Sequence, residues 1–128
     1  MDEKFKDNEF LLRAVWPPNR RPDFWVNGRL SSAAFKDSAG LSVNRTGDLS
    51  LEEVVNFTSK RFRGRIVSVT TIDCNFVHAC LRYKPSKENE LHSEIHGSET
   101  EIVLSDEQAL ILARRATIEY IPNSEYMI

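Results

Sequence analysis

Apolar residues in this chain follow two different spacings, which predict both strands and helices. Apolar or β-branched runs predict strands at 10–15, 41–43 and 66–72. The segments 76–83 and 91–96 are also predicted to be extended, because apolar and polar side chains alternate along them. Shorter apolar runs at 101–104 and 118–121 indicate a short strand or approach segment and a last strand, respectively.

Two helices are indicated by the sequences at which they begin. Ser50 to Glu53 and Ser105 to Gln108 are both capping boxes, in which a hydroxyl and a side chain three residues later bond each other's backbone N–H groups. Apolar residues then recur at helical spacing, and basic residues follow near each C-terminal end, where they complement the helix dipole. We predict main helices at about 50–62, with Phe62 on the inner face, and 105–117.

The order of these elements predicts an α+β fold with a mostly antiparallel sheet. The order is strand, irregular segment, helix, several strands and helix, which is not the alternating pattern of a parallel sheet. A length of 128 residues is typical of one domain, so we expect a single α+β domain over 1–128. The charged start, 1–9, and the tail, 123–128, are expected to be frayed.

Composition and charge exclude some classes of protein. The chain is 41% hydrophobic and 28% charged, which is typical of a globular protein, and its net charge of −2 gives no general attraction to nucleic acid or anionic membrane. A basic group could still contact phosphates, although cations at a helix C-terminus are the simpler explanation. This group comprises Lys60, Arg61, Arg63 and Arg65, with Arg20 and Arg21 as further candidates.

The expected location is the cytoplasm, with no membrane partner. No apolar run approaches the roughly 20 residues that span a bilayer, and the N-terminus lacks the apolar segment of a signal peptide. Cys74 and Cys80 are expected to be free thiols, because an extended chain would hold them too far apart for a disulfide. Asp73 beside Cys74 is expected to raise the pKa of that thiol, so it is not indicated as a nucleophile.

The segment 28–45 is the only dense group of small residues and hydroxyls beside an arginine. Ser31 or Ser32 is expected to cap a short helix over 31–36, which Gly40 would close. Backbone N–H groups at that helix start, the two hydroxyls and Arg29 could together hold a phosphate or carboxylate. The more common alternative is that the serines only cap the helix and Arg29 pairs with a carboxylate such as Asp37.

His92 would complete this site if the fold brings it near. Arg29, Ser31, Ser32 and His92 would then form a polar cleft for a phosphorylated ligand, such as a nucleotide or a nucleic-acid end. Whether such a cleft would bind or catalyse stays open, since no recognised catalytic motif is present. No cofactor is predicted.

A metal site is a weaker alternative around the two late histidines. His92, Glu94 and His96 share one face of a strand, but the two histidines would lie about 13 Å apart at their Cα atoms. They could not easily bind one metal ion together, whereas either histidine with Glu94 could. His78 and Cys80 are possible third ligands. A solvated strand face is the favoured interpretation of this pattern.

Two runs of residues resemble those of small bacterial proteins that are described only as hypothetical. The first runs from Gly28 to Phe35 and continues at Leu41-Ser42-Val43-Asn44-Arg45, and the second is His92-Ser93-Glu94-Ile95-His96-Gly97. The resemblance would cover about residues 10–118. It implies bacterial origin and a gene neighbourhood with larger partners, including defence or toxin-type systems. It implies no activity, cofactor or catalytic residue.

The leading functional hypothesis is a small accessory or regulatory protein that binds another protein. The chain carries no recognised catalytic signature, and large apolar residues flank its turns. Trp16, Phe24 and Trp25 are the candidate interface residues, together with the tail 126–128, although they could equally join the core. The alternative hypothesis is the enzyme or sensor of a phosphorylated ligand that uses the polar cleft.

Overall fold

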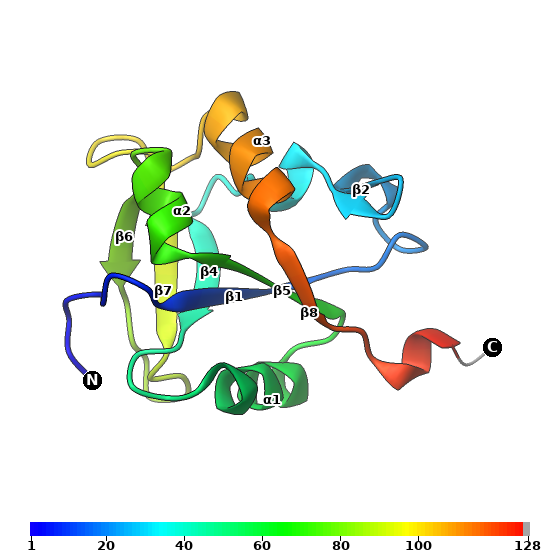
Figure 1. Cartoon of the computed structure of the whole chain (residues 1–128), viewed down its shortest axis with the longest axis horizontal. Helices are drawn as coiled ribbons and strands as arrows, with labels where there is room; N and C mark the ends of the chain where they lie inside the picture. Colours follow the sequence, from blue (N-terminus) through cyan, green and yellow to red (C-terminus); the bar gives the residue numbers. More distant parts are fainter. Residues whose placement is uncertain (127–128) are drawn as a thin grey trace.

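The computed structural model describes residues 1–126, and it shows an α+β fold built on one six-stranded antiparallel sheet (Figure 1). The sheet order is β6-β7-β4-β1-β5-β8, so β1 lies inside the sheet while β6 and β8 form its edges. The strands are β1 (Phe10–Val15), β4 (Leu41–Arg45), β5 (Arg65–Thr70), β6 (Cys80–Tyr83), β7 (His92–His96) and β8 (Thr117–Tyr120).

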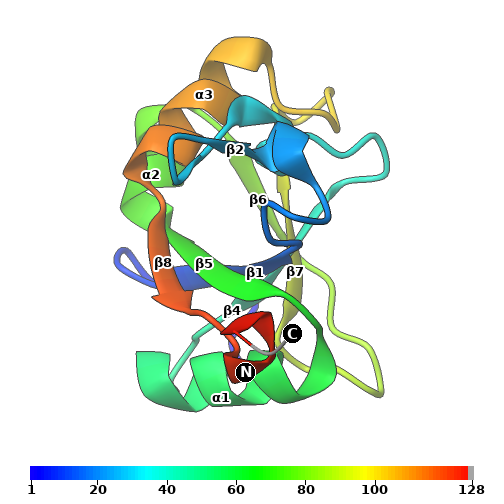
Figure 2. The same ribbon diagram turned by 90° about the vertical axis from the view of Figure 1, so that its right-hand side faces the viewer.

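Helices cover both faces of this sheet, as Figures 1 and 2 show. Helix α1 (Leu51–Arg61) lies on one face, and α2 (Thr71–Phe76) and α3 (Asp106–Arg115) lie on the other. A small hairpin of β2 (Trp25–Val26) and β3 (Arg29–Leu30) sits beside α3. Three single-turn helices complete the fold: η1 (Pro22–Phe24), η2 (Ser32–Phe35) and η3 (Asn123–Tyr126). None of the helices in residues 1–126 is long and apolar enough to cross a membrane.

Alternation along β1 divides the core into two layers. Leu11 and Val15 face α2, α3 and η2, where they join the larger apolar cluster. Leu12 faces the other way and packs with Val54 of α1 and Ile66 of β5. The apolar run predicted as a strand at 10–15 therefore corresponds to burial on both faces of an interior strand.

Both predicted main helices are confirmed, with their caps. In α1 the Ser50 hydroxyl accepts from the Glu53 N–H and the Glu53 carboxylate accepts from the Ser50 N–H; Ser105 and Gln108 do the same at α3. The expected inner position of Phe62 is wrong. It follows the last turn of α1 in an extended conformation, and 46% of its surface is exposed.

The largest error of the sequence analysis lies at 71–83. The expected strand to residue 72 stops at Thr70, which caps α2 through a capping box with Asp73, and β6 begins only at Cys80. β-branched residues at 66–72 favoured a strand, but the local Thr-x-x-Asp capping pattern prevailed at its end. The segment 101–104, expected as a short strand or approach, contains no strand.

The turn at Asn27-Gly28 is confirmed and joins β2 to β3. Its φ angles of 51° and 79° are those of a type I′ hairpin turn, which Asn-Gly favours. The expected cap at the next helix is wrong: Ser31 precedes η2, but its hydroxyl donates to the carbonyl of Asp23 instead. Gly40 does not close that helix, since η2 ends at Phe35 and Gly40 (φ 106°) leads into β4.

A buried ion pair between Arg45 and Glu9 holds the N-terminal segment against the sheet. Arg45 donates to both carboxylate oxygens of Glu9, at 2.9 and 2.6 Å, and each side chain is only 1% exposed. Arg45 also donates to the backbone carbonyls of Asp2 and Lys4, and the ring of Phe5 lies 4.2 Å from its guanidinium carbon. The residues expected to fray at the start of the chain thus supply much of the environment of Arg45.

Candidate functional site

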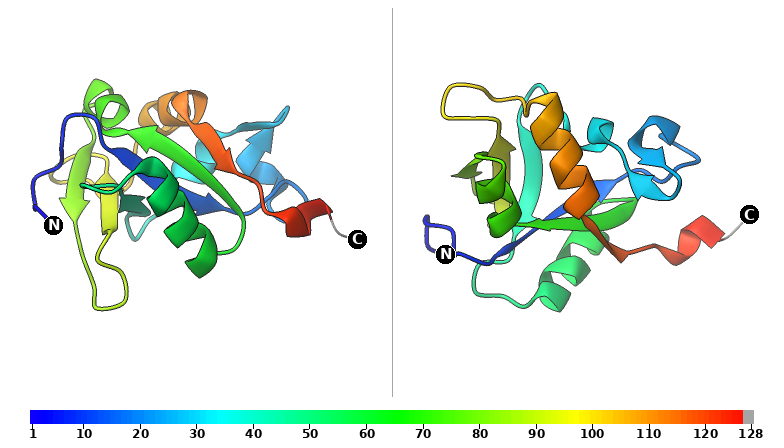
Figure 3. Two further views of the ribbon diagram at one scale, coloured as in Figure 1. Left: turned by 60° about the horizontal axis from the view of Figure 1, so that its bottom comes forward. Right: turned by 45° about the horizontal axis from the view of Figure 1, so that its top comes forward.

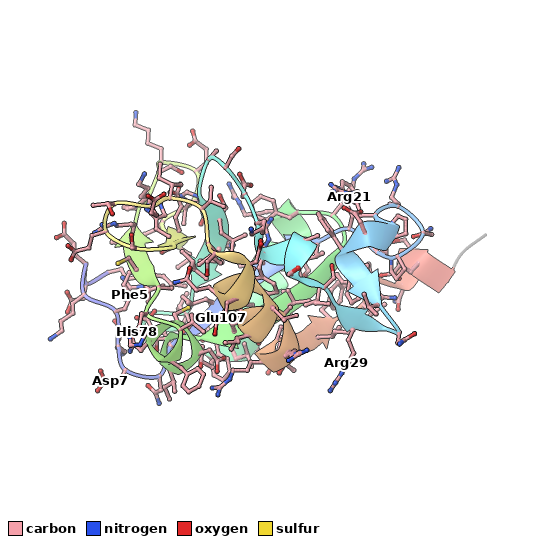
Figure 4. The ribbon with its side chains drawn as sticks, turned by 90° about the horizontal axis from the view of Figure 1, so that it is seen from above. Phe5, Asp7, Arg21, Arg29, His78 and Glu107 are labelled. Carbon is pink, nitrogen blue, oxygen red and sulfur yellow. The ribbon has the colours of Figure 1, made fainter. Side chains whose placement is uncertain are left out.

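Three of the four predicted ligand residues lie on the α3 side of the sheet. Arg29 is exposed on the hairpin, as Figure 4 shows from above. Ser31 is engaged with Asp23, and Ser32 begins η2 without capping it. Both β3 and η2 contact α3.

His92 lies on the opposite face. It pairs across the sheet with Asn44, whose side-chain amide donates to Thr58 of α1 at 3.0 Å. Partners in an antiparallel pair project to the same side, so His92 faces the α1 layer. The cleft expected from Arg29, Ser31, Ser32 and His92 is therefore not formed, because the sheet separates His92 from the other three.

His92 instead meets a different serine. Its Nδ1 lies 2.8 Å from the backbone carbonyl of Lys84, and its Nε2 lies 3.2 Å from the hydroxyl of Ser42. A carbonyl oxygen only accepts, so Nδ1 carries the hydrogen. In a neutral imidazole Nε2 is then the acceptor of the Ser42 hydroxyl.

Arg13 has the strand parity of Leu11 and Val15, and its guanidinium lies in the gap where β1 and β4 part, between η2 and Ser42 of β4. These strands pair at only two positions, Leu11 with Arg45 and Leu12 with Asn44. Just beyond, Arg13 donates from Nε to the carbonyl of Ala34 and from Nη1 to the carbonyl of Ser42, both at 3.1 Å. The bond to Ser42 thus links β1 to β4 where their backbones no longer pair, and the bond to Ala34 links β1 to η2.

A hollow of about 230 Å³ opens at this gap, and we call it the Arg13 hollow. Strands β1, β4 and β7 and helix α1 each supply part of its wall. The lining residues are Leu12, Arg13, Ala14, Ser42, Val43, Asn44, Thr58, Phe62 and His92. It therefore brings together an arginine, a serine and a histidine, although only His92 was among the predicted residues.

Glu94 and His96 form a separate pair on the same strand face. The His96 Nε2 lies 2.8 Å from the Glu94 carboxylate, and the Lys84 ammonium lies 3.5 Å from it. Burial alone would raise the pKa of Glu94, but these two partners outweigh it and hold that pKa below its ordinary value. Within residues 1–126, no group of three His, Cys, Asp or Glu side chains is arranged to hold a metal ion, and His92 is occupied by Lys84 and Ser42.

Helix α1 and the edge strand β8 are in contact, and their ribbons can be followed in Figure 3. The hollows that open along them form a second surface feature, which we call the α1–β8 groove. It consists of two adjoining hollows that share Ser59 and Tyr120. The larger hollow, about 530 Å³, is lined by residues that include Trp16, Arg20, Phe62, Arg63 and Tyr120. The other hollow is bounded by Glu52 and Glu53 at the start of α1.

The predicted interface residues are divided by the structure. Trp16 is 38% exposed and lines the groove. Trp25 is 7% exposed in the core, and its indole N–H donates to the carbonyl of Trp16 at 2.8 Å, so it offers no interface. Phe24 is half-buried beneath the Arg21 guanidinium. The predicted contribution of residues 127–128 and of the Tyr126 side chain lies outside the described part of the chain.

Both cysteines are free thiols, as expected. Burial, together with the smaller effect of the neighbouring Asp73 carboxylate, raises the pKa of Cys74 to about 12. Cys74 and Cys80 were expected to be far apart because the chain between them was predicted to be extended. In the structure Cys74 lies in α2 and Cys80 in β6.

The sequence analysis missed Arg13 and Ser42. Arg13 had one signal: it is a charged residue inside an otherwise apolar strand, where a charge needs partners. Ser42 had none, because a serine between two apolar residues is an ordinary outward position on a strand.

Comparisons with protein-family models, curated proteins and solved structures found no match for this chain.

Proposed function

We propose that this protein is an accessory or regulatory protein that binds another protein through the α1–β8 groove. The observation that carries the proposal is the grouping of three exposed aromatic rings with two arginines. Trp16, Phe62 and Tyr120 are 38%, 46% and 38% exposed, and Arg20 and Arg63 line the same hollow. Trp, Tyr and Arg dominate the binding energy of protein interfaces.

The arginines of the groove are available to a partner. Arg20 and Arg63 form no ion pair with any residue of the described range, although Arg20 lies over the Trp16 ring at 4.9 Å. At the other end of the groove, Glu52 and Glu53 are exposed. An acidic side chain of the partner is therefore expected at the Arg20–Arg63 end.

The sheet edge beside the groove favours an extended partner segment. β8 pairs with β5 on one side only, so its outer backbone groups have no strand neighbour among residues 1–126. A partner strand can add to such an edge through backbone hydrogen bonds and place side chains in flanking pockets. Tyr120 stands at this edge and lines both hollows, so it would contact such a segment along the groove.

Co-purification of the tagged protein at native expression levels tests this proposal. A specific partner should be recovered with the wild type and lost with Phe62→Ser and with the charge reversal Arg20→Glu/Arg63→Glu. Val26→Ser is the matched control, because Val26 is 59% exposed on the β2–β3 hairpin and lines neither hollow of the groove. Recovery of the wild type alone as a monomer, or equal recovery of a partner with all variants, would contradict the proposal.

A further inference from the structure

Arg13 is a half-buried cation whose charge has no counter-ion within the described part of the chain. Its two hydrogen bonds go to neutral carbonyls, and no carboxylate lies at ion-pair distance. Burial lowers the pKa of this guanidinium, and the more distant Asp37 offsets only part of that effect. Desolvated charges in proteins are usually paired, so an unpaired one that lines a hollow indicates a place for an anion.

The polar groups around the hollow come from three different strands. Arg13 on β1 has no partner for Nη2 among the described residues, since its two hydrogen bonds use Nε and Nη1. Ser42 on β4 contributes a rotatable hydroxyl, and His92 on β7 contributes Nε2. The contact of Nδ1 with the Lys84 carbonyl fixes the ring, so that Nε2 is held beside the Ser42 hydroxyl.

We propose that the Arg13 hollow binds the phosphate group of a ligand, with Arg13 as the charged anchor, Ser42 as a further donor and His92 Nε2 as the acceptor for a phosphate hydroxyl. A phosphate has three or four oxygens to meet polar groups from three strands, whereas a carboxylate has only two. The hollow, about 230 Å³, is smaller than the roughly 300–1,000 Å³ of sites that enclose a whole ligand, so only the charged head would enter. This site is distinct from the α1–β8 groove and does not rest on the protein-binding proposal, although Phe62 lines both features.

An unpaired Glu94 carboxylate would repel an anion in the hollow, because Glu94 is the cross-strand partner of Ser42. Its carboxylate is already paired with His96 at 2.8 Å and with Lys84 at 3.5 Å, so its negative charge is compensated locally. The charge of Arg13 is not compensated in this way. The balance at the hollow therefore favours an anion.

Titration with inorganic phosphate at constant ionic strength, followed by NMR of the His92 ring and the Ser42 amide, tests the proposal. Saturable shifts of both signals are expected. Arg13→Gln should weaken binding by at least about tenfold, because a hydrogen bond to a charged group is lost. Arg29→Gln is the matched control and should bind phosphate like the wild type, since Arg29 is an exposed arginine on the other side of the sheet. Acetate should bind more weakly than phosphate.

Ser42→Ala and His92→Asn keep the test decisive if Arg13→Gln does not fold. Ser42 is exposed and His92 is only half-buried, so neither change removes a core side chain, and each should weaken phosphate binding several-fold. No saturable shift in the wild type would overturn the proposal. Equal affinity of the wild type, Ser42→Ala and His92→Asn would also overturn it, as would equal binding of acetate and phosphate.

Discussion

Two arginines on neighbouring strands of one sheet have opposite surroundings. Arg45 is fully enclosed, and a carboxylate, two backbone carbonyls and an aromatic ring satisfy it. Arg13 is partly enclosed, and its hydrogen bonds within residues 1–126 go to two neutral carbonyls. The first arrangement is complete without any ligand, whereas in the second the charged residue lines a hollow and has no carboxylate partner among the described residues.

This difference separates a structural arginine from a candidate binding arginine. Burying a charge is tolerated when its partner is buried with it, and Glu9 meets this condition for Arg45. The Glu9 carboxylate also accepts hydrogen bonds from the backbone N–H groups of Lys6 and Gly47, both at 2.7 Å. Arg45 and Glu9 therefore hold the chain start against the sheet, and Arg13 remains able to take an external partner.

The largest effect on stability is expected from breaking the ion pair of Arg45 and Glu9. Arg45→Met should lower the free energy of unfolding by about 3–5 kcal/mol, because it leaves the Glu9 carboxylate buried without a counter-charge. Urea denaturation measures this loss, and Arg29→Met is the exposed control, with an expected change within about 0.5 kcal/mol. The double variant Glu9→Gln/Arg45→Met should lose less than the sum of the single variants. Additive losses would show that the two side chains are not coupled.

Acid is expected to weaken the same pair. Burial alone would raise the pKa of Glu9, but hydrogen bonds from Arg45, Lys6 and Gly47 outweigh it and hold that pKa below its ordinary value of 4.5. A carboxyl whose pKa is lower in the folded than in the unfolded chain stabilises the fold above the unfolded pKa. That stabilisation is lost as the pH falls through the folded pKa.

The unfolding free energy of the wild type should therefore drop more steeply below about pH 5 than that of Glu9→Gln. Other acidic groups respond to pH in both proteins, so the difference between the two curves isolates Glu9. Denaturation at a series of pH values measures both curves. Parallel curves would contradict the lowered pKa of Glu9.

A smaller loss of stability is expected from replacing Arg13, which lacks a carboxylate partner among the described residues. Arg13→Gln should lower the free energy of unfolding by about 1–3 kcal/mol, because the carbonyls of Ala34 and Ser42 lose a charged donor but no opposite charge is left unpaired. Urea denaturation beside Arg45→Met gives the comparison directly. A loss as large as that of Arg45→Met would mean that Arg13 is chiefly structural.

The smallest effect on stability is expected from Ser42→Ala, within about 0.5 kcal/mol, because this hydroxyl is exposed. Its effect should appear instead in the response to ligand. Phosphate at ten times its dissociation constant should stabilise the wild type by about 1.4 kcal/mol, and at the same concentration it should stabilise Ser42→Ala less. Thermal unfolding with and without phosphate measures both changes. Equal stabilisation would remove Ser42 from the site.

Sequence by itself determined the features that depend on near neighbours. The strand at 10–15, the capped helices over 51–61 and 106–115 and the Asn27-Gly28 turn were all predictable, because periodicity, caps and turn residues act over a few positions. Helix α2 also had a local signal in Thr70 and Asp73, but the preceding β-branched run hid it.

Tertiary structure alone decided the environments of the charged residues. Glu9 and Arg45 are 36 positions apart, and Ser42 and His92 are 50 apart, so no local pattern specifies either contact. The same holds for the separation of Arg29 from His92, which depends on which face of the sheet each segment reaches. The sequence specifies the chemistry of each side chain, but strand order and register decide which groups meet. Order and register arise from packing of the whole chain.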